Sequence, residues 1–234
     1  MGSETLCKWL HELLARLPGV MYPFCLSSLP DRGVYFFYEK GEHWGHGGVK
    51  PRIVRIGSTT SDDFPRRINE HFLIDDSSVR FDLNRGKPSD RSIFRKNIGR
   101  ALLNKAHDPY LDVWEIDFIT KKKRAEFSHL RDLAKERVIE AEVTRTLREN
   151  FSFRFISLDG KDWKQTDLEK LLIAARGGCS LCSPSASWLG LHSPKPRIRK
   201  SGMWQEQHLY SQPLREEQMR DVELLAAETL VRFS

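Results

Sequence analysis

The pattern of apolar and polar positions predicts an antiparallel hairpin in the first quarter of the chain. Residues 33–39 are rich in Val, Tyr and Phe, and residues 52–56 form a second short run with Ile and Val. β-Branched and aromatic residues favour strands, and the glycine-rich segment 41–48 suits a hairpin connection of some length. We therefore expect two neighbouring strands over these runs.

A third strand is predicted much later in the sequence. The run FSFRFISL at 151–158 alternates phenylalanine with Ser and Arg, which is typical of a strand with one buried face. Residues 110–119 also alternate apolar with acidic residues and suit a short strand or an extended connection. The predicted fold class is α+β, sandwich-like, with a small mixed or antiparallel three-stranded sheet flanked by helices.

Apolar residues at helical spacing predict the flanking helices. Polar residues 58–63 offer N-caps to a helix on which Phe64, Ile68 and Phe72 share one side, so we expect its charged side to face away from the core. The longest helical pattern runs from 121 to 149. Further helices are expected at 4–16, 92–103, from Thr166 onward and at 214–232.

The whole chain, 1–234, is expected to form a single domain. Its core would span about 28–176, with the N-terminal helix 4–16 and a C-terminal extension 177–234 packed on it. The extension is rich in Gly, Ser and Pro, yet it carries large apolar residues and should be ordered. The polar loop 75–91 is long and carries several cations, which is typical of functional or mobile loops.

The net charge and the hydropathy of the chain indicate which classes of partner to expect. The 234 residues carry a net charge of +6, which suits a polyanionic partner but is shared by many ordinary proteins. The sequence has no apolar run of membrane-spanning length and lacks the pattern of a signal peptide at its start. We expect a cytoplasmic protein without a membrane partner.

Four cysteines are too few for a disulfide scaffold in a chain of this length, so reduced thiols are expected. The pair Cys179-x-x-Cys182 suggests zinc, with His192 or His208 as further ligands. A structural zinc site usually needs two ligand pairs at matched spacing, and only one is visible. Two thiols in a turn rich in Gly and Ser are the favoured interpretation.

Polar side chains gather on the hairpin and on the helix after it. Tyr35 closes the Gly-Val-Tyr of the first strand, and Arg55 opens the Arg-Ile-Gly of the second. Arg67 and His71 are four residues apart and therefore share one helix face. We expect these four residues to form most of an active site, with the carboxylate of Glu169 arriving from much later in the chain.

In order and spacing these residues resemble the GIY-YIG nucleases, and further segments resemble a bacterial subgroup of that family. The similarity covers about residues 28–210. Its elements are Gly33-Val34-Tyr35, Arg55-Ile56-Gly57, Arg67 with His71, the segment SIFRKNIGRALL, Glu169, and the SxxWLG…SGxW pattern from Ser185 to Trp204.

The resemblance implies an endonuclease that hydrolyses phosphodiester bonds. That reaction needs a deprotonated water, a cation against the charge that gathers on phosphorus, and help for the leaving oxygen. Tyr35 would be the general base, with His71 orienting it or relaying its proton. Arg67 would bind the scissile phosphate, and Glu169 would hold one Mg²⁺ or Mn²⁺ per site.

The second motif departs from the family pattern. Arg55 stands where the family name has tyrosine, so a fixed cation replaces a phenol. Arg55 could bind phosphate or stabilise the phenolate of Tyr35, or it could be repelled by Arg67 unless an anion lies between them.

Three further residues are candidate substrate-binding groups: Arg66, Arg95 and Gln205. Gln205 would replace an Asn that supports the site in many members, although its side chain is longer. Arg66 is adjacent to Arg67, and only the four-residue spacing to His71 favours Arg67.

Each residue by itself also has an ordinary structural explanation, such as a packed tyrosine or a solvated helix face. Their joint occurrence favours a Mg²⁺-dependent DNA endonuclease acting in restriction, defence or DNA repair. A catalytically inactive nucleic-acid-binding protein with the same fold is the main alternative. A partner-binding protein that assembles through helix 121–149 is a third. RNA as substrate and a homodimer are both compatible with the sequence.

Overall fold

A four-stranded antiparallel sheet lies at the centre of the computed structural model, which describes residues 2–74 and 79–233. Part of the expected loop 75–91 thus lies outside the described residues. The strand order is β1-β4-β2-β3, and every neighbouring pair is antiparallel. The strands are β1 (Val20–Met21), β2 (Gly33–His43), β3 (Pro51–Ser58) and β4 (Phe151–Ser157).

The predicted α+β class is confirmed, with one more strand than expected. The additional strand, β1, has two residues and pairs with β4 through Val20 and Phe153. Two residues are too few to produce an alternating pattern in the sequence, so the strand is defined only by its pairing.

A β-bulge in β3 places two successive side chains, those of Val54 and Arg55, on the same face of the sheet. Phe37 of β2 pairs with Arg55, but the next residue, Tyr38, pairs with Ile53, so Val54 is the additional residue. Val54 packs in the apolar cluster that contains Phe37, and the Arg55 guanidinium lies on the same side of the sheet, over Phe94.

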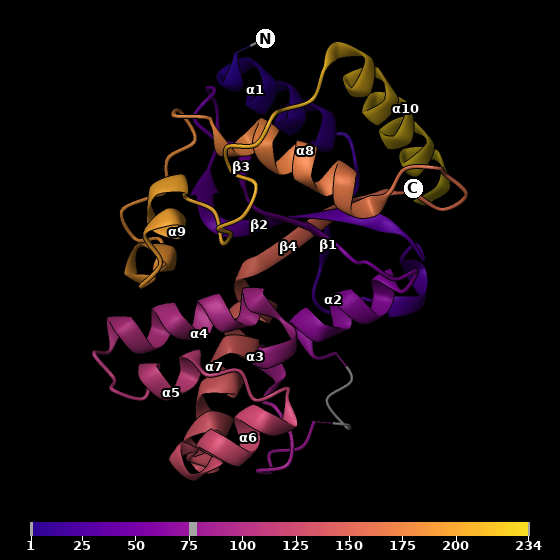
Figure 1. The fold of residues 1–234 in the computed structure, drawn as a ribbon. Coiled ribbons are helices and arrows are strands. Elements are labelled where there is room, and N and C mark those ends of the chain that lie inside the picture. Colours follow the sequence, from indigo (N-terminus) through magenta and orange to yellow (C-terminus); the bar gives the residue numbers. More distant parts are fainter. Residues whose placement is uncertain (1, 75–78, 234) are drawn as a thin grey trace.

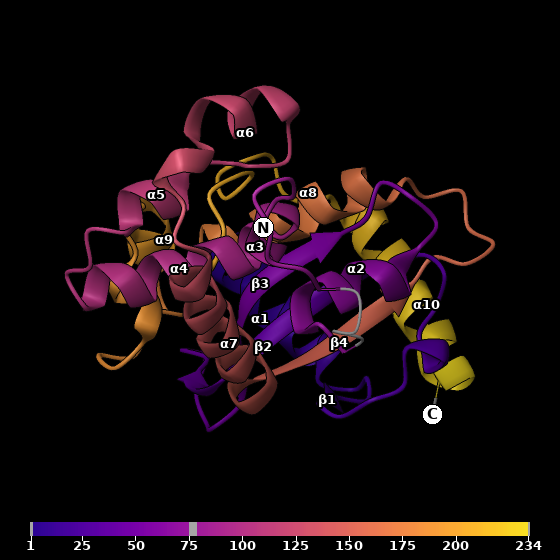
Figure 2. The same cartoon turned by 90° about the horizontal axis from the view of Figure 1, so that it is seen from below.

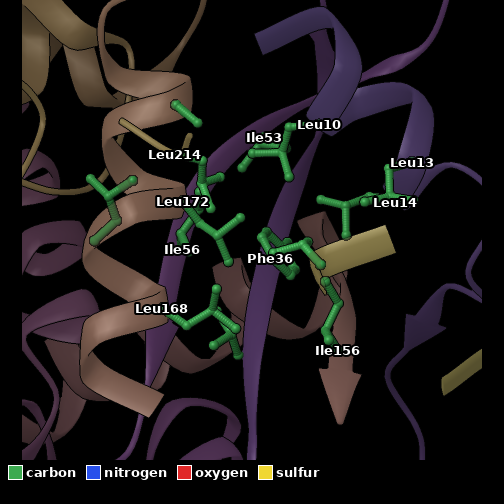
Figure 3. Packing of buried hydrophobic residues seen from close by; sticks show 14 of the residues in the cluster. Leu10, Leu13, Leu14, Phe36, Ile53, Ile56, Ile156, Leu168, Leu172 and Leu214 are labelled. Atoms are coloured by element: carbon green, nitrogen blue, oxygen red, sulfur yellow. The ribbon is translucent and has the colours of Figure 1, made fainter. Parts of the chain in front are cut away.

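One face of the sheet is covered by α1 (Ser3–Leu14), α8 (Gln165–Gly177) and α10 (Glu216–Phe233) (Figure 1). Figure 3 shows the packing of this layer, in which side chains from β2, β3 and β4 meet leucines of α1 and α8. Central members are fully buried: Leu10, Leu14, Phe36, Ile53, Ile56, Ile156, Leu168 and Leu172.

The opposite face is covered by α2 (Phe64–Phe72), α4 (Ile93–Lys105) and α7 (Leu133–Asn150) (Figure 2). Its core is largely aromatic, and the ring centroids of Phe37 and Phe94 are 4.9 Å apart. Tyr35 belongs to this layer.

Two expectations for the middle of the chain are wrong. Residues 110–119 contain the short helix α5 (Leu111–Glu115). The helix expected over 121–149 is divided into α6 (Lys121–Phe127), η2 (Ser128–Leu130) and α7. Asp132 ends the interruption, because its side chain accepts a hydrogen bond from the Lys135 amide and caps α7. The short helix α3 (Pro88–Arg91) leads into α4.

The C-terminal extension packs against the far end of β2. This extension contains η3 (Leu189–His192) and α9 (Pro196–Ser201). Outside the extension, another short turn, η1 (Leu26–Ser28), precedes β2. The Glu39 carboxylate accepts hydrogen bonds from Trp188 Nε1 at 2.7 Å and Trp204 Nε1 at 2.8 Å. Both tryptophans of the SxxWLG…SGxW pattern therefore bind one carboxylate on β2.

Within the described residues, no helix is both long and apolar enough to span a bilayer.

Candidate active site

Tyr35 lies fully buried on β2, directly opposite Gly57 of β3. A Cβ atom built on Gly57 would lie only 2.2 Å from the phenol oxygen of Tyr35. The phenol therefore occupies the space that any other residue at position 57 would fill. This contact explains why glycine follows Arg55-Ile56.

His71 connects the phenol to the start of α4. Its Nε2 is 2.9 Å from Tyr35 Oη, and its Nδ1 is 2.7 Å from Ser92 Oγ. Ser92 is the N-cap of α4, and its Oγ also accepts a hydrogen bond from the Arg95 amide. Tyr35, His71 and Ser92 thus form a continuous hydrogen-bonded chain between β2 and α4.

The imidazole of His71 is held neutral. Burial lowers the pKa of His71 well below its usual value, and the cations Arg67, Arg55 and Arg95 lower it further. The expectation that the charged side of this helix faces away from the core is wrong for His71, which is fully buried, and right for the exposed Arg66. A neutral imidazole has one donor and one acceptor nitrogen, so it can hydrogen-bond to both Tyr35 and Ser92.

Arg67 lies beside the phenol and is partly exposed to solvent. Its Nη1 donates to Glu70 Oε2 and to the Arg91 carbonyl, both at 2.9 Å, and its side chain is 21% exposed. Burial by itself would lower the pKa of Arg67, but the Tyr35 phenol and the Glu70 carboxylate outweigh it and raise the pKa. A cation therefore stands beside the phenol in the folded chain.

Arg55 is also on this side of the sheet, but its described contacts are internal. Its Nη1 donates to the Trp204 carbonyl at 2.7 Å, and its guanidinium lies 5.0 Å from the centroid of the Phe94 ring. The side chain is buried. Arg55 thus connects β3 to the C-terminal extension and adds positive charge near His71.

Arg95 and Gln205 also make internal hydrogen bonds. Arg95 is fully buried; it donates to the His71 carbonyl at 2.9 Å and to Glu140 Oε2 at 2.6 Å. Gln205 Oε1 accepts a hydrogen bond from the Ile56 amide at 3.2 Å. These contacts hold the backbone of two motif segments in place.

Glu169 approaches the end of β3 from the opposite layer. It lies on α8, and its Oε2 accepts a hydrogen bond from Ser58 Oγ at 2.5 Å. Ser58 pairs with Val34, one position beyond the pair of Gly57 with Tyr35. The Glu169 carboxylate and the Tyr35 phenol thus contact adjacent residues of the edge strand, Ser58 and Gly57, from opposite faces of the sheet.

The donor set at Glu169 fits a hard divalent cation. Its carboxylate is partly exposed and, among the described residues, does not belong to a group of three or more Asp, Glu, His or Cys ligand atoms. Mg²⁺ is commonly held by one or two carboxylates while it keeps several waters and binds substrate phosphates. A single glutamate at an accessible sheet edge is compatible with that mode.

A cavity of about 610 Å³ lies beside α2 and α3, and Glu70 and Arg91, the two described hydrogen-bond partners of Arg67 Nη1, are among its lining residues. Glu70 is the acidic member of its described lining. Six of the described lining residues are cationic: Arg66, Arg80, Arg85, Lys87, Arg91 and Arg124. Such a concentration of Arg and Lys favours polyanions with many phosphates.

Two residues of this arrangement do not stand out in the sequence as members of the site. Ser92 is a polar residue just before an apolar helical pattern, which signals an N-cap but not a partner for His71. Asp63, which caps α2 through the Arg66 amide at 3.1 Å, is one of several possible caps in 58–63.

The described geometry thus gives an antiparallel α+β core with a buried tyrosine hydrogen-bonded to a helix-borne histidine, a neighbouring arginine and a carboxylate at the sheet edge. In a comparison with protein families, the family model for the GIY-YIG domain matches residues 6–229. The chain belongs to the GIY-YIG family, whose members are generally endonucleases. No curated protein and no solved structure is significantly similar to it.

Proposed function

We propose that this protein is a divalent-metal-dependent endonuclease that hydrolyses phosphodiester bonds in DNA. Tyr35 acts as the general base, Arg67 binds the scissile phosphate and Glu169 holds the metal ion. The observation that carries the proposal is the hydrogen-bonded chain Tyr35–His71–Ser92 with the Arg67 guanidinium beside the phenol.

The proton steps use the chain's own residues. The Arg67 guanidinium lies beside the phenol of Tyr35, the proposed general base. Tyr35 Oη then accepts a proton from the attacking water. His71 Nε2, 2.9 Å away, holds the phenol oxygen in position.

Arg67 has donors beyond its two described bonds at Nη1, so its planar fork can also bind a phosphate oxygen. Glu169 would hold Mg²⁺ or Mn²⁺, which when bound supplies charge against the phosphate and the leaving oxygen. Arg66, on the rim of the basic cavity, extends the positive surface on which the DNA backbone would lie. Arg55, Arg95 and Gln205 act as positioning residues through the internal hydrogen bonds described above.

A plasmid-nicking assay tests this function. Wild-type protein should convert supercoiled plasmid to nicked or linear DNA with Mg²⁺, and EDTA should stop the reaction. Tyr35→Phe, which keeps the ring and removes the hydroxyl, and Glu169→Gln should each reduce the rate by at least about 100-fold, as expected for a general base or a metal ligand. Tyr210→Phe is the matched control, because Tyr210 is 70% exposed and is not one of the proposed site residues.

A catalytically inactive nucleic-acid-binding protein is the second candidate. One observation favours it: Tyr35 and His71 are both fully buried, so a water and a phosphate reach the phenol only if side chains around it move. Wild-type protein that binds DNA without Mg²⁺-dependent cleavage, unchanged by Tyr35→Phe, would establish this alternative and contradict the nuclease.

A further inference from the structure

Three cysteines and one histidine converge on the side of the molecule away from His71. Cys7 lies on α1, His46 in the connection between β2 and β3, and Cys179 and Cys182 just after α8. Their four ligand atoms all lie within 4.8 Å of one another. The three cysteines are buried, whereas His46 is partly exposed.

The spacing matches a tetrahedral metal site. Cys7 Sγ is 3.7 Å from Cys182 Sγ, and Cys179 Sγ is 3.5 Å from His46 Nε2. A tetrahedron built on Zn–S bonds of about 2.3 Å and Zn–N bonds of about 2.0 Å has edges of roughly 3.5–3.8 Å. A disulfide needs sulfur atoms about 2.05 Å apart, and all four cysteines of the chain are free thiols.

A buried cation without an ionic partner lies beside these thiols. Arg176 on α8 is fully buried; its Nη2 donates to the Cys182 carbonyl at 2.8 Å and its Nε to the Ile53 carbonyl at 3.2 Å. In the described part of the chain its Nη1 has no hydrogen-bond partner, and no carboxylate pairs with it. An uncompensated buried charge is strongly destabilising. Zn²⁺ with three thiolates and a neutral imidazole carries a charge of about −1, which would compensate Arg176.

The backbone around the cluster also supports a bound metal. The Gly45 amide donates to Cys182 Sγ at 3.4 Å, the type of bond that orients a metal-binding thiolate. A Cβ atom on Gly45 would lie 1.8 Å from the Leu181 carbonyl oxygen, so only glycine allows this approach.

His11 is close to the cluster but both its ring nitrogens are engaged. Its Nε2 accepts from the Ile53 amide at 3.0 Å, which leaves Nδ1 to donate to the Cys7 carbonyl at 2.8 Å. His46 is therefore the histidine available to a metal.

We propose that Cys7, His46, Cys179 and Cys182 bind one Zn²⁺ ion in a closed structural site. Four protein ligands leave no open position for substrate, which separates this site from the cation held by Glu169. The ion ties together α1, the β2–β3 connection and the start of the C-terminal extension. His192 and His208, the ligands considered from the sequence, are not members of the cluster.

Metal analysis of the purified full-length protein tests the site. Protein prepared under reducing conditions should contain about one zinc ion per chain by inductively coupled plasma mass spectrometry. Cys182→Ser and His46→Ala should each lose most of it. Cys25→Ser should retain it, because Cys25 is an exposed thiol outside the cluster.

A second measurement does not depend on whether the variants fold. Wild-type protein reconstituted with Co²⁺ in place of zinc should show the visible bands of tetrahedral cobalt and the charge-transfer absorption of cobalt thiolate, and a strong chelator should lower its thermal midpoint. Wild-type protein without zinc that also gives no cobalt spectrum would overturn the proposal, as would iron and sulfide in place of zinc, or loss of zinc in Cys25→Ser.

Discussion

At position 57 the absence of a side chain is what allows the phenol of Tyr35 to lie across β3. The atom that alanine adds would overlap Tyr35 Oη and its ring carbons, all within 2.5 Å. Neither the buried ring nor the strand backbone can yield at little cost in a close-packed core.

We therefore expect Gly57→Ala to lower the free energy of unfolding by about 1–3 kcal/mol or more. Urea unfolding measures this change. Gly19→Ala is the control, because nothing lies within 4 Å of a Cβ built there and its backbone is not left-handed. Equal stability of the two variants would contradict the contact between Gly57 and Tyr35.

His71 makes stability depend on pH in a known direction. Its pKa is lowered in the folded chain, whereas an unfolded imidazole titrates near about 6.5, so the unfolded chain binds a proton that the folded chain does not. Its contribution to stability is present above about pH 6.5 and is lost as the pH falls, by up to about 1.4 kcal/mol per pH unit.

The variant His71→Gln removes this titration and keeps a side chain that can hydrogen-bond. Urea unfolding between pH 7.5 and 5 should show that wild type loses stability more steeply than the variant. Parallel profiles would mean that His71 is not held neutral in the folded protein.

At the scale of elements, α4 is fixed to α7 by a buried ion pair. Arg95 of α4 binds Glu140 of α7 at 2.6 Å, and Glu140 also accepts from the Ser89 amide at 2.7 Å. The same helix α7 carries Glu142, whose pair with Arg145 is exposed. One helix thus offers a buried and an exposed carboxylate for comparison.

Glu140→Ala should cost about 3–5 kcal/mol, because it leaves the Arg95 charge buried and unpaired. Glu142→Ala should change stability by less than about 1 kcal/mol, since exposed pairs contribute little. Thermal and urea unfolding of the two variants measure the difference. Because Arg95 also donates to the His71 carbonyl, we expect Glu140→Ala to reduce nicking activity as well.

At the scale of the whole molecule, six of the described cationic residues line the cavity beside α2 and α3. Arg85 lines this cavity with a side chain that is 66% exposed, and Arg220 is an exposed arginine on α10, in the opposite layer. The two residues have the same formal charge, but Arg220 is not among the described residues that line the cavity.

Arg85→Ala should weaken DNA binding and reduce the slope of log Kd against log salt by about 1, the value for one lost phosphate contact. Arg220→Ala should leave the affinity for DNA and the salt slope unchanged. Fluorescence anisotropy with a labelled duplex at several salt concentrations measures them. A larger effect of Arg220→Ala would place the DNA elsewhere.

Much of the fold follows from local sequence. Strands β2, β3 and β4 and helices α1, α2, α4, α8 and α10 repeat their apolar residues at strand or helix spacing, because each buries one side against the sheet. The four-residue spacing of Arg67 and His71 likewise places both residues on one side of α2. Such patterns do not reveal the two-residue strand β1, because it is defined by its pairing with β4. They also do not reveal the interruption at 128–132, because it is defined by the cap of α7.

The sequence by itself determined the α+β class, the family motifs and the order in which Tyr35, Arg67, His71 and Glu169 occur. Only the tertiary structure decided that His71 points inward to Tyr35 and Ser92, and that Glu169 reaches β3 from the opposite layer. It also brought Cys7 and His46 to Cys179 and Cys182. The physical reason is that helix and strand periods fix which face a residue occupies, whereas the packing of distant elements fixes what that face meets.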